Sequence, residues 1–152
     1  MGSGWRIVKA KHAATAFSGE GARLYGGRWN SPGVAMVYLS EHRSLGALEI
    51  LVHTRPLTFL DSYQAFFAEW DDALQETLSS LPGLWKAEPP GIATMQIGDQ
   101  WVREKRSAVL VVPSVLIPEE RNFVMNPAHT DFRKIAIHDR GKFALDARLL
   151  NR

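Results

Sequence analysis

Residues 40–54 carry the clearest helical pattern of the chain, in the sequence SEHRSLGALEILVHT. Leu45, Leu48 and Val52 recur at the spacing that places side chains on one face of an α-helix, and Glu49 falls on the same face. An ionised carboxylate in an apolar face is unfavourable by several kcal/mol unless it is paired, hydrated or used in chemistry. The pattern therefore predicts a helix over this segment, with a candidate functional group at Glu49.

Short apolar runs predict strands on both sides of this helix. Trp5–Ala10 and Val34–Leu39 precede the helix, and Leu57–Leu60 and Tyr63–Trp70 follow it. Ala108–Val112 is a continuous apolar run rich in valine, which is typical of a buried central strand.

The remaining patterns predict further helices and a hairpin. Ser40 is a suitable N-cap for the first helix. Asp72–Leu81 reads as a short helix that stops at a Pro-Gly pair, and Thr94–Lys105 reads as a longer one. Arg133–His138 and Lys142–Leu145 flank an Asp-Arg-Gly turn signal, which favours a hairpin. The mixture predicts an α+β fold with a bent, mostly antiparallel sheet and flanking helices.

Residues 19–33 form a polar segment with five glycines, GEGARLYGGRWNSPG, which predicts a long ordered loop. Loops of this length in compact domains are usually functional or disordered. Arg28 is the candidate here, because its glycine neighbours let the backbone approach a ligand and a guanidinium matches phosphate or carboxylate groups. Tyr38 lies in the strand that follows. Arg28, Tyr38 and Glu49 therefore predict a pocket within one strand–helix unit.

Each of these residues also has a purely structural interpretation. Glu49 can equally form a structural ion pair with Arg28 or Arg43, since such pairs also occur on buried faces. Tyr38 and Trp29 are residue types that more often belong to a core, with their polar atoms satisfied by the backbone. The pocket is a hypothesis that only the spatial arrangement can decide.

The composition narrows the class of protein. A chain of 152 residues with 45% hydrophobic and 22% charged residues is typical of one soluble globular domain over residues 1–152, of which Met1–Gly4 is expected to be in part a cloning remnant. No apolar run approaches the about 20 residues of a membrane helix. The absence of cysteine excludes disulfides and thiolate chemistry and is typical of a reducing cytoplasm. The net charge of +2 is a weak indication of nucleic-acid binding, and the five histidines lack metal-ligand spacing.

Several segments together resemble the RES domain, a family named for an arginine, a glutamate and a serine. The resemblance runs through GGRWNSPG, VAMVYLS, LEILVH, VPSVLIPEERNFVMNP and KFALDARLL, and so spans nearly the whole chain. On this basis the family arginine falls on Arg28, the tyrosine on Tyr38 and the glutamate on Glu49. The family serine falls on Ser114, with Ser107, which lacks the preceding Val-Pro, as the alternative.

The resemblance implies a cytoplasmic bacterial toxin with a fold similar to the ADP-ribosyltransferase toxins, partnered by an Xre-like helix-turn-helix antitoxin. Such toxins break the nicotinamide–ribose bond of NAD⁺, so that NAD⁺ is a substrate and no cofactor is expected. The leading expectation is an NAD⁺ glycohydrolase or phosphorylase that depletes NAD⁺ and arrests growth, with no membrane partner and with DNA contacted only through the antitoxin. The alternative is an ADP-ribosyltransferase acting on a specific protein. More distant alternatives are a non-catalytic nucleic-acid or protein-binding module and a ribonuclease toxin.

The resemblance also implies roles for single residues. Glu49 would stabilise the positive charge that develops on the ribose when the glycosidic bond breaks. Arg28 would bind the pyrophosphate or the nicotinamide-side phosphate, and Tyr38 would pack against the nicotinamide or the ribose. The further candidate NAD⁺-binding residues are Ser114, Trp29 and Asn126.

Overall fold

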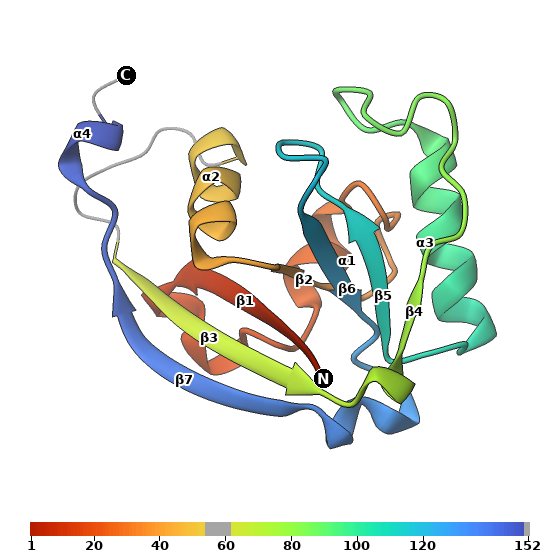
Figure 1. The fold of residues 1–152 in the computed structure, drawn as a ribbon, viewed down its shortest axis with the longest axis horizontal. Coiled ribbons are helices and arrows are strands. Elements are labelled where there is room, and N and C mark those ends of the chain that lie inside the picture. The colour runs from red at the N-terminus through yellow and green to blue at the C-terminus, as the bar shows by residue number, and fades with distance from the viewer. Residues whose placement is uncertain (54–61, 151–152) are drawn as a thin grey trace.

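The computed structural model describes residues 1–53 and 62–150, and this part of the chain forms one seven-stranded sheet flanked by helices (Figure 1). The strand order is β4-β5-β6-β2-β1-β3-β7, and neighbouring strands are antiparallel except β4 and β5, which are parallel. The α+β class with a mostly antiparallel sheet is therefore confirmed. The strands are β1 (Gly2–Lys9), β2 (Val37–Ser40), β3 (Tyr63–Trp70), β4 (Gln75–Thr77), β5 (Val109–Pro113), β6 (Arg121–Met125) and β7 (Ala136–Phe143).

Two of the helices, α2 and α3, flank the centre of the sheet (Figure 1). The α-helices are α1 (Glu20–Tyr25), α2 (Arg43–His53), α3 (Ile92–Glu104) and α4 (Ala147–Leu150), and the 3-10 helices are η1 (Ala10–Thr15), η2 (Asp72–Leu74) and η3 (Thr130–Lys134). Within the described ranges, no helix is both long enough and apolar enough to cross a membrane.

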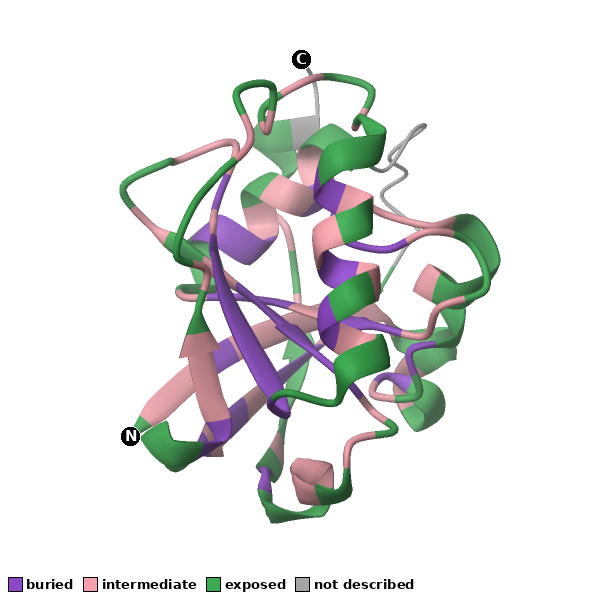
Figure 2. Cartoon of the chain, turned by 90° about the vertical axis from the view of Figure 1, so that its right-hand side faces the viewer, coloured by how far each residue is buried: buried purple, intermediate pink, exposed green. Residues whose placement is uncertain are grey.

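The two faces of the sheet carry separate cores. One core contains Val37 and Leu39 of β2, packed with alternate residues of the neighbouring strands. The other lies beneath α3, whose buried face is formed by Thr94, Gly98 and Trp101 (Figure 2). Side chains alternate along a strand, so Tyr38 and Ser40 of β2 point to the opposite face, which α3 covers.

Helix α2 covers the same face of the sheet as α3. Tyr38 packs in the core beneath α3, and Ser40 lies two residues further along β2, so both side chains point to one face. Gly46 of α2 approaches Ser40 and also Ile7 of β1, where a Cβ on Gly46 would lie 3.1 Å from the Ile7 side chain. Helices α2 and α3 therefore lie on one face of the sheet, over β2 and its neighbours.

Several predicted elements are confirmed with shifted ends. β3 has the predicted bounds, and β1, β2, β5 and α3 differ from the predicted segments by a few residues. The predicted strand Leu57–Leu60 lies outside the described residues. The predicted N-cap at Ser40 is wrong, because Ser40 is the last residue of β2 and α2 begins at Arg43.

The predicted helix over Asp72–Leu81 is wrong. The Asp71 side chain accepts a hydrogen bond from the Ala73 amide and closes a single 3-10 turn, η2. Gln75 is already extended, and β4 then pairs with β5. Pairing along the open edge of β5 satisfies the backbone groups of this segment and overrides a helical pattern of only a few residues.

The predicted hairpin near the C-terminus is also wrong. β7 is one continuous strand paired with β3, and its Asp-Arg-Gly sequence coincides with a shift of register opposite Gln64 and Phe66. Gly141 has a φ of 78°, and its amide donates to the Asp139 carboxylate at 2.8 Å. The same residues that signal a turn form a β-bulge here.

Candidate active site

Glu49 lies at the edge of the buried face of α2, not at its centre. The buried residues of the helix are Leu45, Gly46 and Ile50, whereas Leu48 and Val52 are 40% and 45% exposed. The prediction that Leu48 and Val52 lie on the buried face of the helix is therefore wrong. Gly46 permits a close approach to β1 and β2, so the face that contains Leu45, Gly46 and Ile50 packs on these strands.

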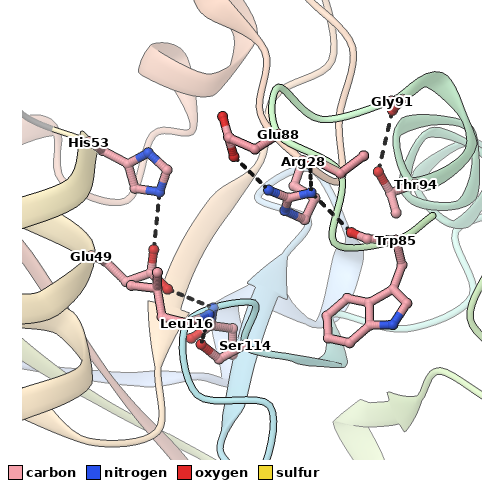
Figure 3. A network of polar contacts seen from close by, with 11 residues as sticks. Arg28, Glu49, His53, Trp85, Glu88, Gly91, Thr94, Ser114 and Leu116 are labelled. Carbon is pink, nitrogen blue, oxygen red and sulfur yellow. Dashed lines mark hydrogen bonds and ion pairs between the residues drawn. The ribbon is translucent and has the colours of Figure 1, made fainter.

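Two hydrogen bonds hold the Glu49 carboxylate. Oε1 accepts from Asn122 Nδ2 of β6 at 3.2 Å, and Oε2 lies 3.2 Å from His53 Nε2, one helical turn along α2 (Figure 3). The Glu49 side chain is 26% exposed and that of His53 is 66% exposed. The carboxylate is thus fixed on its inner side and open on its outer side.

The surroundings raise the pKa of His53 above its usual value. The largest cause is the hydrogen bond that the imidazole makes to the Glu49 carboxylate, and partial burial opposes it. The charges of Glu88 and Arg28 also act on this imidazole, the first raising and the second lowering its pKa. The Glu49–His53 pair and the Arg28–Glu88 pair therefore lie within electrostatic reach of one another.

Arg28 approaches the site from the glycine-rich loop. One guanidinium nitrogen, Nη1, donates to the carbonyl oxygens of Trp85 and Ala87 at 3.0 and 2.8 Å, and Nη2 pairs with the Glu88 carboxylate at 3.0 Å (Figure 3). The Arg28 side chain is 13% exposed, whereas that of Glu88 is 70% exposed. A largely buried cation with one exposed anionic partner is suited to exchange that partner for an anionic ligand.

Tyr38 supports this loop from below. Its hydroxyl donates to Asn30 Oδ1 at 2.6 Å and accepts from the Trp29 amide at 3.0 Å. A Cβ at Gly27 would lie 2.6 Å from the same hydroxyl, so only glycine fits there. Burial raises the pKa of the Tyr38 phenol well above its usual value, and the group stays neutral. Tyr38 therefore holds the two residues that follow Arg28 in the loop.

Tyr38→Phe is expected to loosen the Arg28 loop. The substitution leaves the Trp29 amide and the Asn30 side-chain oxygen without the hydroxyl that joins them. A buried polar group without a partner costs about 1–3 kcal/mol, and the thermal unfolding midpoint should fall accordingly. Differential scanning calorimetry measures this loss, and Tyr25→Phe, which changes a tyrosine 83% exposed on α1, is the control. An unchanged midpoint in Tyr38→Phe would contradict the supporting role.

The glycine-rich segment is a tightly held loop that includes the short helix α1. Asn30 is fully buried, and its side-chain amide donates to the carbonyl oxygens of Ala22 and Val34 at 2.8 and 2.9 Å. The Asp99 carboxylate of α3 accepts from the Ser31 amide and hydroxyl at 2.9 and 2.6 Å. The segment is ordered, as predicted, but the prediction of a loop throughout is wrong because Glu20–Tyr25 forms α1.

The two candidate serines lie at opposite ends of β5. Ser114 follows the strand, is fully buried, and accepts through Oγ from the amides of Leu116 and Ile117 at 3.2 and 3.1 Å (Figure 3). Ser107 precedes the strand and joins Trp101 Nε1 to the Val109 carbonyl. Ser114 thus shapes a turn beside Glu49, and Ser107 is a core hydrogen-bonding residue.

Two other predicted NAD⁺-binding residues lie apart from Glu49. Trp29 is 3% exposed and packs in the core beneath α3. Asn126 follows β6, at the opposite end of that strand from Asn122, and its side chain accepts from the Ala128 amide. The structure brings Arg28, Glu49 and Ser114 to one region, with Tyr38 beneath the loop that carries Arg28.

Three residues of the site were not predicted from the sequence. His53 follows Glu49 by four residues, a spacing that places both side chains on one helix face and that indicates such a pair. Asn122 has the appearance of a turn residue, and only its position in β6 reveals the contact. Glu88 is 60 residues from Arg28 and has no local signal. Among the described residues, no group of three or more His, Asp or Glu side chains could hold a metal ion.

The fold and the site together define an α+β domain in which a largely buried arginine and a partly exposed glutamate belong to one network of polar residues (Figure 3). A family model for the RES domain matches residues 3–146. The Prs ADP-ribosylating toxin of a Sphingobium species is 38% identical over 155 residues, which cover 97% of this chain and 96% of the relative. Proteins named Toxin Res from Yersinia enterocolitica and Photorhabdus laumondii are each 37% identical, covering 95% and 96% of this chain and 97% and 96% of the relatives. The chain belongs to the RES domain family and is a toxin of the RES class.

Proposed function

We propose that this toxin consumes NAD⁺ by breaking the bond between nicotinamide and ribose. The observation that carries the proposal is the Glu49 carboxylate, which Asn122 anchors on one side, which is partly exposed on the other, and which bonds a histidine that the Arg28 charge also reaches. The Sphingobium relative is named as an ADP-ribosylating toxin, which supports NAD⁺ as the substrate.

The chemistry requires one carboxylate and one anion-binding group. When the N-glycosidic bond breaks, its electron pair goes to the pyridinium nitrogen, so nicotinamide leaves neutral and needs no general acid. Positive charge develops on the ribose, as in glycoside cleavage generally. A carboxylate fixed in place beforehand stabilises this charge without reorganising during the reaction. Glu49 takes this role, and Arg28 binds the pyrophosphate.

Two kinds of acceptor for the ADP-ribose, a small molecule and a protein, are supported by different observations. Water or inorganic phosphate is favoured by the open outer side of Glu49, where the neighbouring His53 side chain is 66% exposed. Attack on the ribose by water releases a proton, whereas attack by an ionised oxygen of phosphate needs no proton loss, and either gives a small soluble product. A protein acceptor is favoured by the name of the Sphingobium relative.

The fate of the ADP-ribose distinguishes these acceptors. Purified protein is incubated with NAD⁺, with and without phosphate, and separately with a bacterial lysate, and the products are identified by mass. Free ADP-ribose or its phosphate indicates the glycohydrolase or phosphorylase, whereas a mass increase confined to one lysate protein indicates the transferase. Unchanged NAD⁺ in every condition would contradict NAD⁺ as the substrate.

Glu88→Gln is expected to lower KM for NAD⁺, because Glu88 competes with the pyrophosphate for Arg28. A partly exposed ion pair contributes up to about 1 kcal/mol, so KM should fall by no more than about fivefold, with kcat nearly unchanged. Steady-state kinetics measure the change. The matched control is Glu76→Gln, which removes the ion pair between Glu76 of β4 and Arg106. A raised KM in Glu88→Gln would show that Glu88 assists binding instead.

We also propose that a helix-turn-helix antitoxin of the Xre-like type restrains the toxin in the cytoplasm. Such a partner would cover the region around Glu49 and Arg28 and use Arg28 as one anchor, and the toxin would meet DNA only through it. The names of the relatives as toxins support a neutralising partner. A structure of the complex with Glu49 and Arg28 left uncovered would contradict this arrangement.

A further inference from the structure

We infer that Asn122 is the positioning residue that fixes the orientation of the Glu49 carboxylate, an inference that rests on the proposed function. Asn122 lies within β6, where it is paired with Ser40 of β2 and Val112 of β5. A residue with a strand on both sides has a backbone that cannot shift freely. Asn122 therefore offers Glu49 a fixed donor from an element other than its own helix.

The contact determines which way the Asn122 amide points. An ionised carboxylate only accepts hydrogen bonds, so the amide must present its nitrogen to Glu49, and Nδ2 lies 3.2 Å from Oε1. This orientation leaves Asn122 Oδ1 buried, with no hydrogen-bond partner among the described residues. A buried acceptor without a partner is unfavourable for stability. An apolar side chain of the same branching would avoid that penalty, so the amide is explained by what it does to Glu49.

Neither neighbour of Glu49 can replace this contact. His53 lies on the same helix as Glu49, and its side chain is 66% exposed, so the pair can turn outward together. Ser114 is engaged with the amides of Leu116 and Ile117. Without Asn122, the carboxylate is free to rotate toward solvent, away from the position that it holds over the sheet.

The consequence is a separation between substrate binding and chemistry. Arg28 is held by the loop and by residues 85–88, and none of its contacts involves Asn122. Loss of Asn122 should therefore leave NAD⁺ binding intact. A displaced catalytic group lowers the rate of the chemical step even when the group itself is present.

The test compares Asn122→Leu and Asn122→Asp with the wild type in NAD⁺ turnover and thermal unfolding. Asn122→Leu keeps the branching and removes the donor, and Asn122→Asp keeps the shape and places a second carboxylate against Glu49. Both should lower kcat by about tenfold or more, with KM changed by less than about threefold. Asn122→Leu should unfold at a temperature no lower than the wild type, because it removes the unpartnered oxygen.

The matched controls are Gln64→Leu and Gln64→Glu. Gln64 Nε2 of β3 donates to the Asp139 carboxylate of β7 at 2.6 Å, which is an amide–carboxylate pair of the same kind. Both Gln64 variants alter this pair and should keep the wild-type kcat. If the wild type is active and Glu49→Gln is inactive, a wild-type kcat in folded Asn122→Leu or Asn122→Asp overturns this inference alone. A kcat loss that only parallels a lower unfolding midpoint also overturns it. A wild type without NAD⁺ turnover overturns the proposed function together with it.

Discussion

Glu49→Gln is expected to abolish NAD⁺ turnover while the protein remains folded. The substitution keeps the size of the side chain and an oxygen that accepts from Asn122, but it removes the negative charge that faces the ribose. Removing one fixed electrostatic group from an active site lowers kcat by about 10²–10³-fold. The effect on folding is small, because the ion pair with the exposed His53 contributes at most about 1 kcal/mol.

The measurement is kcat for NAD⁺ consumption together with the thermal unfolding midpoint. Glu69→Gln is the matched control, since Glu69 pairs with His138 at 3.0 Å as Glu49 pairs with His53, but on β3 and β7. The control should keep wild-type kcat. Turnover retained in folded Glu49→Gln would remove Glu49 from the chemistry and leave the structural ion pair as its role.

Gly98→Ala is expected to destabilise the protein and displace the Arg28 loop. Gly98 lies within α3, where alanine normally favours the helix by up to about 1 kcal/mol. A Cβ at this position, however, would overlap the backbone carbonyl of Trp29, the residue after Arg28. A backbone oxygen cannot rotate away as a side chain does. The clash therefore outweighs the helix preference and should cost about 2 kcal/mol or more.

Denaturant unfolding measures this loss, and NAD⁺ KM measures the displaced arginine. Gly21→Ala is the control, because Gly21 lies in α1 and a Cβ there would meet no atom within 4 Å. That variant should be as stable as the wild type or slightly more so. Gly98→Ala with wild-type stability would mean that α3 and the loop can move apart without loss.

Local patterns predicted several of the strands and the longest helix, because these segments carry their signal in residues close together in the chain. Tyr63–Trp70 is a run rich in aromatic residues and forms β3, and residues 94–104 form most of α3. The errors occur where a partner distant in sequence decides the conformation. β4 is extended because the β5 edge is open to it, and β7 is continuous because β3 pairs along it.

The same contrast between local patterns and partners distant in the sequence applies to the candidate site. Arg28 and Glu49 could be found from the sequence because a glycine-rich loop and a carboxylate within an amphipathic helix are local signals. The contacts that define their state come from elsewhere: Asn122 from β6 and Glu88 from the segment before α3. The face of α2 was mispredicted because Gly46, and not a large apolar residue, sets its approach to the sheet.

Release of nicotinamide from NAD⁺ tests the central claim most directly, because it accompanies bond cleavage whether water, phosphate or a protein accepts the ADP-ribose. The wild type and Glu49→Gln are incubated with NAD⁺, phosphate and a bacterial lysate, and nicotinamide is quantified over time. We predict release by the wild type and none above background by the folded variant. Equal release by both proteins, or none by either, would contradict cleavage of NAD⁺ at Glu49.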